Sequence, residues 1–201
     1  SPAQPISFAG CMTQNFLFLI FALTECFLLV VMSYDRYVAI CLPLRYSTIM
    51  SWRVCVTLAG VSCTLGIQLA LVHLVLLLPL PFCGPQKVNH FFCEIVAVLK
   101  LACADTYLNE VVIVAAGVLV LVGPVSAIVV SYGHILRAVL KIRSAEGRRK
   151  AFSTCSSHLC VVGLFFGIAI LVYMVPDSSQ REEMEKTLSL FYSLFNPMLN
   201  P

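Results

Sequence analysis

Long apolar runs restrict what this chain can fold into more than any other feature of its sequence. Five runs can be marked, at about 11–40, 54–80, 107–142, 151–175 and 186–201. A helix needs about 20 apolar residues to cross a bilayer, and each of the first four runs exceeds that length. Only 11% of the 201 residues are charged, against about 25% in soluble domains. We therefore predict an integral membrane protein.

The same runs are expected to form helices rather than strands. No water satisfies backbone N–H and C=O groups inside the hydrocarbon layer, so a spanning segment is a helix or part of a closed barrel. A barrel needs short segments of alternating hydrophobicity, and the sequence contains none. The expected fold class is an all-α membrane protein with five transmembrane helices.

Basic residues are distributed unevenly between the runs and predict the orientation of the chain. Cytoplasmic loops of membrane proteins are enriched in Lys and Arg, and two of the four connections, together with the ends of the runs that lead into them, hold nine of the thirteen such residues. The nine are Arg36, Arg45, Arg53, Arg137, Lys141, Arg143, Arg148, Arg149 and Lys150. Most acidic residues fall in the other two connections. We expect an external N-terminus and a chain that ends toward the cytoplasm.

Four of the ten cysteines lie on the predicted external side, which is an oxidising compartment. They are Cys11, Cys83, Cys93 and Cys103. An even number there favours disulfides over free thiols, and four cysteines allow three pairings. The other six cysteines are most simply small packing residues.

The first run carries charged residues that a bilayer disfavours. Glu25 lies near its middle, and Asp35 and Arg36 stand side by side at its end. Three helical turns separate Glu25 from Arg36, so both lie on one stripe that must face other helices or a water-filled cavity. An arginine that merely snorkels to the membrane surface would explain Arg36 alone.

Four sequence motifs carry a resemblance to a known family. They are MSYDRYVAICLPLRY (32–46), LPFCGPQKVNHFFCEIVAVLKLACADT (80–106), SYGHILRAVLKIRSAEGRRKAFSTCSSHL (131–159) and PMLNP (197–201). In this order and spacing they resemble the olfactory receptors, which are rhodopsin-like G-protein-coupled receptors. The resemblance implies that the five runs are helices three to seven of a seven-helix receptor bundle. The chain is then expected to be an internal fragment of a longer receptor that forms a single transmembrane domain.

The resemblance also implies the roles of several residues. It selects the disulfide pairs Cys11–Cys93 and Cys83–Cys103 from the three alternatives. It makes Asp35, Arg36, Tyr37 and Tyr132 a G-protein switch, in which Arg36 pairs with Asp35 at rest and turns to the G protein in the active state.

Helix faces and the resemblance together predict an apolar ligand pocket in the outer half of the bundle. The candidate lining residues are Phe18, Leu19, Ala22, Leu23, Ala116, Gly117, Phe166, Ala169, Ile170, Tyr173 and Ser193. Phe166 stands where the family usually has Tyr, so a phenol is missing beneath the pocket. Few of these side chains are polar, so we expect a small, volatile, hydrophobic odorant as the ligand.

The expected partners follow from the same resemblance. They are an odorant, a stimulatory heterotrimeric G protein on the cytoplasmic face, and membrane lipid, with no cofactor and no nucleic acid. The expected location is the plasma membrane. The sequence does not name the odorant.

The sequence allows two interpretations for each of three features. Glu25 binds sodium together with an acid from a helix outside this chain, or it is protonated and bonded to a neighbouring helix. His158 is a packed, hydrogen-bonded histidine or a proton sensor, and the first is favoured. The basic segment 134–143 contacts a partner protein or lipid headgroups, and the partner is favoured.

Other classes of protein fit the sequence less well. A secondary transporter predicts repeated halves and several polar groups at the membrane midplane, whereas Glu25 is the only acid clearly at mid-span. A purely structural membrane protein has no need for the Asp35–Arg36 pair. An enzyme is not expected, because no loop gathers a nucleophile, a base and an orienting group.

Overall fold

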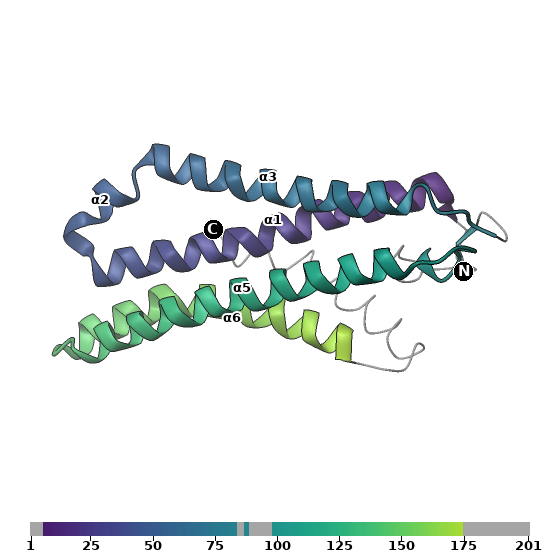
Figure 1. Cartoon of the computed structure of the whole chain (residues 1–201). Coiled ribbons are helices and arrows are strands. Elements are labelled where there is room, and N and C mark those ends of the chain that lie inside the picture. The colour runs from purple at the N-terminus through teal and green to yellow at the C-terminus, as the bar shows by residue number, and fades with distance from the viewer. Residues whose placement is uncertain (1–5, 84–86, 89–97, 175–201) are drawn as a thin grey trace. The chain divides into compact units, whose positions relative to one another are not determined.

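The computed structural model describes residues 6–83, 87–88 and 98–174, and most of these residues are helical (Figure 1). The elements are β1 (Ile6–Ser7), α1 (Phe8–Cys41), the 3-10 turn η1 (Pro43–Arg45), α2 (Tyr46–Ile49), α3 (Trp52–Leu77), β2 (Lys87–Val88), α5 (Tyr107–Leu140) and α6 (Ala145–Met174). The four long helices are each long and apolar enough to cross a membrane. The predicted all-α membrane fold class is confirmed. The fifth predicted run, 186–201, lies outside the described residues.

A capping serine and a proline set the ends of α1. The Gly10 backbone N–H donates to Ser7 Oγ at 3.2 Å, so Ser7 caps the first turn. Pro43 follows the last turn, and the residue before a proline avoids helical backbone angles. The helix therefore ends at Cys41, close to the predicted boundary.

Two of the helix boundaries that differ from the prediction have a local cause in the sequence. α6 begins at Ala145 rather than near 151, because Ser144 Oγ accepts from the Gly147 N–H at 3.0 Å and caps a polar first turn that apolar runs do not reveal. α3 ends at Leu77 rather than near 80, because Pro79 disfavours helical backbone angles at Leu78, the residue preceding it.

The described helices belong to two compact units, and α1 and α5 contribute a segment to each. The first unit combines Ser1–Leu28 with Trp52–Ser126. The second combines Leu29–Ser51 with Ala127–Pro201.

In the first unit, α3 packs on α1 through a row of small residues. Ser62, Gly66 and Ala70 are spaced four residues apart on one face of α3, and all three are buried. A Cβ atom at Gly66 would stand 3.0 Å from Thr24 N and 3.2 Å from Ile20 O. The missing side chain at Gly66 therefore allows the two helices to approach closely, as small residues do between membrane helices.

One end of the first unit is closed by the connection between α3 and α5. β1 pairs with β2 in antiparallel register, and the ring of Phe8 lies 4.8 Å from that of Phe82. A buried apolar cluster lies beneath, made of Cys11, Met12, Leu77, Val98 and Leu99. The start of α1 is thus joined to this connection by backbone pairing and by packing.

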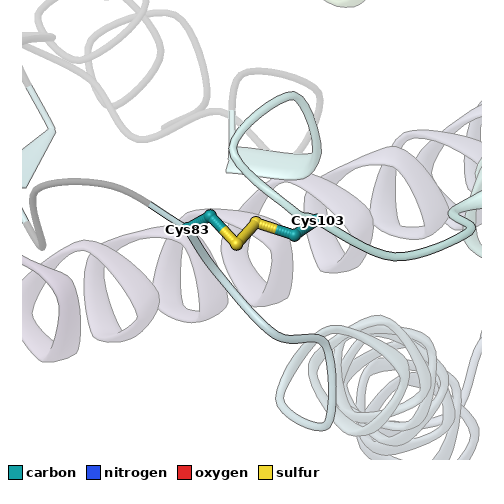
Figure 2. Close-up of a disulfide and its surroundings, with 2 residues drawn as sticks. All are labelled: Cys83 and Cys103. Atoms are coloured by element: carbon teal, nitrogen blue, oxygen red, sulfur yellow. A yellow bond between two sulfur atoms is a disulfide. The ribbon is translucent and has the colours of Figure 1, made fainter.

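A disulfide links Cys83 to Cys103 within the same connection (Figure 2), with their Cα atoms 5.6 Å apart. The pair is the one that the family resemblance implies. Cys11 is also disulfide-bonded, and Cys93, its predicted partner, lies outside the described residues.

Breaking the Cys83–Cys103 disulfide is expected to destabilise the full-length receptor by about 3 kcal/mol, since the bond closes a loop with a sequence separation of 20. Cys83→Ser, Cys103→Ser and the double variant should lower the thermal unfolding temperature of the purified receptor equally, because each removes the same bond. Cys160→Ser, at an exposed free cysteine, is the control and should leave it unchanged. A double variant much less stable than either single variant would contradict the prediction.

In the second unit, α5 and α6 pack with the end of α1 around a small apolar core. Ile135, Val139 and Cys155 are buried there. The apolar side chains of the basic segment 134–143 divide between two environments. Ile135 and Val139 face this core, whereas Leu136 and Leu140 are 52% and 64% exposed. The segment therefore keeps an apolar surface for lipid or a partner.

Candidate functional site

Asp35 lies near the end of α1 and is held by the turn that follows the helix. The Tyr46 hydroxyl donates to Asp35 Oδ1 at 2.8 Å. The described residues contain no ion pair between Asp35 and Arg36, although the resemblance led us to expect one at rest. Neighbouring side chains on a helix point about 100° apart, which separates the two charged groups.

Arg36 has one buried nitrogen with unused hydrogen-bonding capacity. Its Nε atom is buried, and no described residue bonds to that atom. Its charge is close enough to act on Tyr132 of α5 and on Cys155 and His158 of α6. Leaving a buried donor unpaired costs about 1–3 kcal/mol. A hydrogen-bond acceptor that reached Arg36 Nε would therefore bind there favourably.

His158 joins three helix segments of the second unit through its two ring nitrogens. It is 1% exposed. Nε2 lies 3.2 Å from the Leu29 carbonyl oxygen of α1, and Nδ1 lies 2.5 Å from the Tyr132 hydroxyl of α5. A carbonyl oxygen only accepts, so Nε2 carries the proton and Nδ1 accepts from Tyr132. His158 is thus packed and hydrogen-bonded, as the first of its two interpretations expects. Proton sensing stays a prediction.

Tyr132 and His158 are expected to stabilise the receptor as a coupled pair. Tyr132→Phe leaves the buried Nδ1 without a donor and should cost about 1–3 kcal/mol in unfolding free energy. In a double-mutant cycle with His158→Phe, the two losses should be non-additive by at least about 0.5 kcal/mol, measured by thermal unfolding of the purified full-length receptor.

Tyr34→Phe is the matched control for that cycle, because Tyr34 is 42% exposed on α1. It should leave the unfolding temperature unchanged. Strictly additive losses for Tyr132→Phe and His158→Phe would mean that the contact contributes nothing to stability.

The four switch residues predicted from sequence lie in the second unit. The ring of Tyr37 meets that of His134 edge-on at 5.8 Å, and both Tyr37 and Tyr132 pack against the buried cluster of Ile135, Val139 and Cys155. The structure therefore places Asp35, Arg36, Tyr37 and Tyr132 within one unit. Their role as a G-protein switch stays a prediction.

The predicted ligand-pocket residues are divided between the two units. The first unit contains Phe18, Leu19, Ala22, Leu23, Ala116 and Gly117, and the second contains Phe166, Ala169 and Ile170. Phe166 is buried, whereas Phe18 and Ile170 are 58% and 45% exposed. The side chain of Tyr173 and the whole of Ser193 lie outside the described residues. The pocket stays a prediction.

Glu25 is half-buried on α1, beside the α3 contact. Its neighbour Thr24 has a buried hydroxyl that bonds to no described residue, and the Cys26 thiol donates to the Val120 carbonyl at 3.4 Å. Among the described residues, no group of three or more His, Cys, Asp or Glu is placed to hold a metal ion. Sodium binding and a protonated Glu25 both stay predictions.

Two residues near the switch were missed by sequence reasoning. Tyr46 holds Asp35, and Leu44 in η1 is 96% exposed. Both follow Pro43, and a proline after a charged helix end indicates a turn that can fold back on that end. That signal was present in the sequence.

The described helices define a multi-pass helical membrane protein, with a disulfide-linked connection at one end and a buried polar cluster in the second unit. The olfactory receptor family model matches residues 2–201, and the chain belongs to the olfactory receptor family. This family consists of G-protein-coupled receptors, which are not enzymes.

Several curated olfactory receptors are similar to nearly the whole chain. Mouse olfactory receptor 2A7 is 71% identical and human olfactory receptor 2A25 is 72% identical, each over 100% of this chain and 64% of the relative. Human olfactory receptor 2A2 is 70% identical over 97% of this chain and 61% of the relative. The chain thus spans less than two thirds of the length of these relatives.

Proposed function

We propose that the receptor containing this chain detects a small hydrophobic odorant and activates a stimulatory, olfactory-type heterotrimeric G protein. The chain supplies helices three to seven of one transmembrane domain in the plasma membrane, with its N-terminal side external and its C-terminal side cytoplasmic. The ligand occupies the outer half of the bundle. Membership of the olfactory receptor family supports this proposal.

The cluster of Arg36, Tyr132 and His158 is the single observation that carries the mechanism. Tyr132 is engaged by His158, while Arg36 keeps a buried donor that bonds to no described residue. A hydrogen bond contributes only about 0.5–1.5 kcal/mol net, so exchanging Tyr132 from His158 to another partner is inexpensive. Such a site can exist in two states that a ligand and a G protein both bias.

The turn after α1 adds a surface for the G protein. Leu44 is 96% exposed and lies between Asp35 and its partner Tyr46 in the sequence. An apolar side chain held next to a charged helix end suits a protein partner, which needs apolar area at the core of its interface. Movement of the Asp35–Tyr46 contact would move Leu44 with it.

The test is an assay of cyclic AMP in cells that express the full-length receptor together with the stimulatory G protein. A mixture of hydrophobic odorants should raise cyclic AMP only in cells that express the receptor. Omission of the G protein should remove the rise. A receptor that reaches the surface and gives no response to a broad odorant set, or responds without any G protein, would count against this function.

A further inference from the structure

Basic residues surround the short turn that joins α5 to α6 (Figure 1). Among residues 137–150, six are Lys or Arg, and Glu146 is the one acid. All seven of these charged side chains are exposed, and none forms an ion pair with a described residue. The positive charge is therefore not neutralised within the described part of the chain. The six residues, which we call the basic patch, are Arg137, Lys141, Arg143, Arg148, Arg149 and Lys150.

The turn lies at the surface of the membrane, because it joins two helices that are each long and apolar enough to cross one. The two candidate spans are Tyr107–Lys141 and Ala145–Ile170. Clusters of about four to eight Lys and Arg residues directly beside the cytoplasmic end of a membrane helix attract anionic lipids. The basic patch has this size and this position, given the cytoplasmic orientation proposed above.

On both helices, basic residues lie on the side that points away from the packed core. Arg137 follows the buried Ile135 by two positions, which is about 200° around a helix. On α6, Arg149 precedes Ala151, which packs against the same core, by two positions as well. Tyr132 of the proposed switch packs against the core instead. The outward cations are thus directed toward the surrounding lipid and not toward the switch.

Hydrogen bonds hold the turn in one conformation. Arg148 Nε donates to the Ile142 carbonyl oxygen at 2.7 Å, which ties the start of α6 to the end of α5. The Ser144 hydroxyl accepts from the Gly147 N–H at 3.0 Å. A guanidinium group carries five N–H donors, so Arg148 keeps others for a ligand. Cations that are held in place before a ligand arrives lose less entropy when they bind it.

Apolar side chains flank the basic patch. Leu136 and Leu140, each directly before a basic residue, are 52% and 64% exposed, and Phe152 of α6 is 61% exposed. A soluble anion would leave these side chains in water. A lipid would cover them with its acyl chains while its headgroup binds the cations, and removing apolar area from water is favourable. The mixture of charge and apolar surface therefore favours a lipid over a soluble phosphate compound.

We propose that the basic patch binds the headgroup of a membrane lipid that carries phosphate monoesters, such as phosphatidylinositol bisphosphate. Arg148 and Arg149 bind phosphate through paired N–H groups, and Lys150 adds a point charge. Leu136 and Leu140 contact the acyl chains. This site goes beyond the proposed odorant function and depends on that proposal only for the cytoplasmic orientation of the turn.

The first experiment asks whether the site selects phosphate monoesters on a lipid. Purified full-length receptor in detergent is titrated with phosphatidylinositol bisphosphate, phosphatidylinositol or phosphatidylserine, and bound lipid is counted by native mass spectrometry. The bisphosphate should bind at roughly 10-fold lower concentration than the other two, the scale of one charge-assisted hydrogen bond. Equal binding of all three would show only a general attraction to anionic lipid and would overturn the site.

A soluble competitor tests the contribution of the acyl chains. Inositol trisphosphate has the same headgroup chemistry without a lipid tail. It should displace the bisphosphate lipid only at a concentration at least ~10-fold higher than that of the unlabelled lipid itself, because it covers none of the exposed leucines. Displacement at equal concentrations would overturn the assignment to a lipid.

The second experiment locates the site with substitutions of matched charge. Arg149→Gln/Lys150→Gln should weaken binding of phosphatidylinositol bisphosphate at least ~10-fold, since each Lys or Arg beside an anionic surface contributes a factor of about 5. Arg53→Gln/Lys100→Gln removes the same charge from exposed positions outside the patch and should leave binding nearly unchanged. Glu146→Gln removes the acid and should strengthen binding. Equal weakening by the two double variants, or weaker binding by Glu146→Gln, would contradict the site.

A G protein is the alternative partner for the patch, and a signalling assay separates the two. If Arg149→Gln/Lys150→Gln binds the lipid normally but no longer raises cyclic AMP, the lipid site is overturned and the patch belongs to the G-protein contact. Lipid selectivity is measured without an odorant. A receptor that is silent toward every odorant but selects the bisphosphate lipid would therefore count against the proposed function and support this site.

Discussion

Replacing Arg36 with alanine in the full-length receptor is expected to abolish the odorant-dependent rise in cyclic AMP while the receptor still reaches the cell surface. Arg36 Nε is buried and bonds to no described residue. Replacing the side chain with alanine therefore breaks no hydrogen bond between Nε and the described residues. What is lost is a cationic group in the unit that also contains Tyr132 and His158. Cyclic AMP and surface labelling, measured in the same cells, distinguish lost signalling from lost expression.

Arg53→Ala provides the control for this variant, because Arg53 is exposed near the start of α3 and lies outside the cluster. It should signal like the unmodified receptor. Arg36→Lys keeps the charge but loses the planar guanidinium with its five donors, and we expect it to signal weakly. An Arg36→Ala receptor that signals normally at normal surface levels would remove Arg36 from the switch.

Gly66→Ala is expected to lower surface expression and thermal stability of the full-length receptor. The added methyl group would stand 3.0 Å from Thr24 N and 3.2 Å from Ile20 O, both of them backbone atoms that cannot move without shifting α1. Overpacking of this kind typically costs about 1–3 kcal/mol. The unfolding temperature of purified receptor and the fraction at the cell surface are the two measurements.

Gly60→Ala, on the same helix, is the matched comparison, and its expected effect on stability is zero or of the opposite sign. A Cβ atom there would meet nothing within 4 Å. Because alanine favours helix over glycine by up to about 1 kcal/mol, Gly60→Ala should leave stability unchanged or raise it. Equal effects of the two substitutions would show that α1 and α3 do not approach closely at Gly66.

The helices were predictable from sequence because one physical requirement, burial of apolar side chains in lipid, acts along each run. Four of the five predicted runs correspond to α1, α3, α5 and α6. The polar first turn of α6 was missed because Ser144 caps it through a hydrogen bond that hydropathy does not register. The Cys83–Cys103 pairing needed the family resemblance, since spacing alone left three alternatives open.

Contacts within the candidate site were harder to predict than its location. Helical periodicity placed Glu25 and Arg36 on one stripe of α1, but it did not predict that the Leu29 carbonyl, between them in the sequence, bonds to His158. The Asp35–Tyr46 bond depends on how the chain turns after α1, and no periodic pattern encodes that path.

Because α1 is longer than the hydrocarbon layer is thick, the thickness of the bilayer determines the surroundings of the ends of this helix. With 34 residues, the helix is about 51 Å long. Even at a tilt of about 40°, the upper end of the usual range, it covers about 39 Å along the membrane normal, against a hydrocarbon layer of about 30 Å. At least one end must therefore extend into the headgroup layer. Asp35 and Arg36 lie in the last two turns, so a thicker, sterol-rich membrane draws them toward the hydrocarbon and a thinner one exposes them to water.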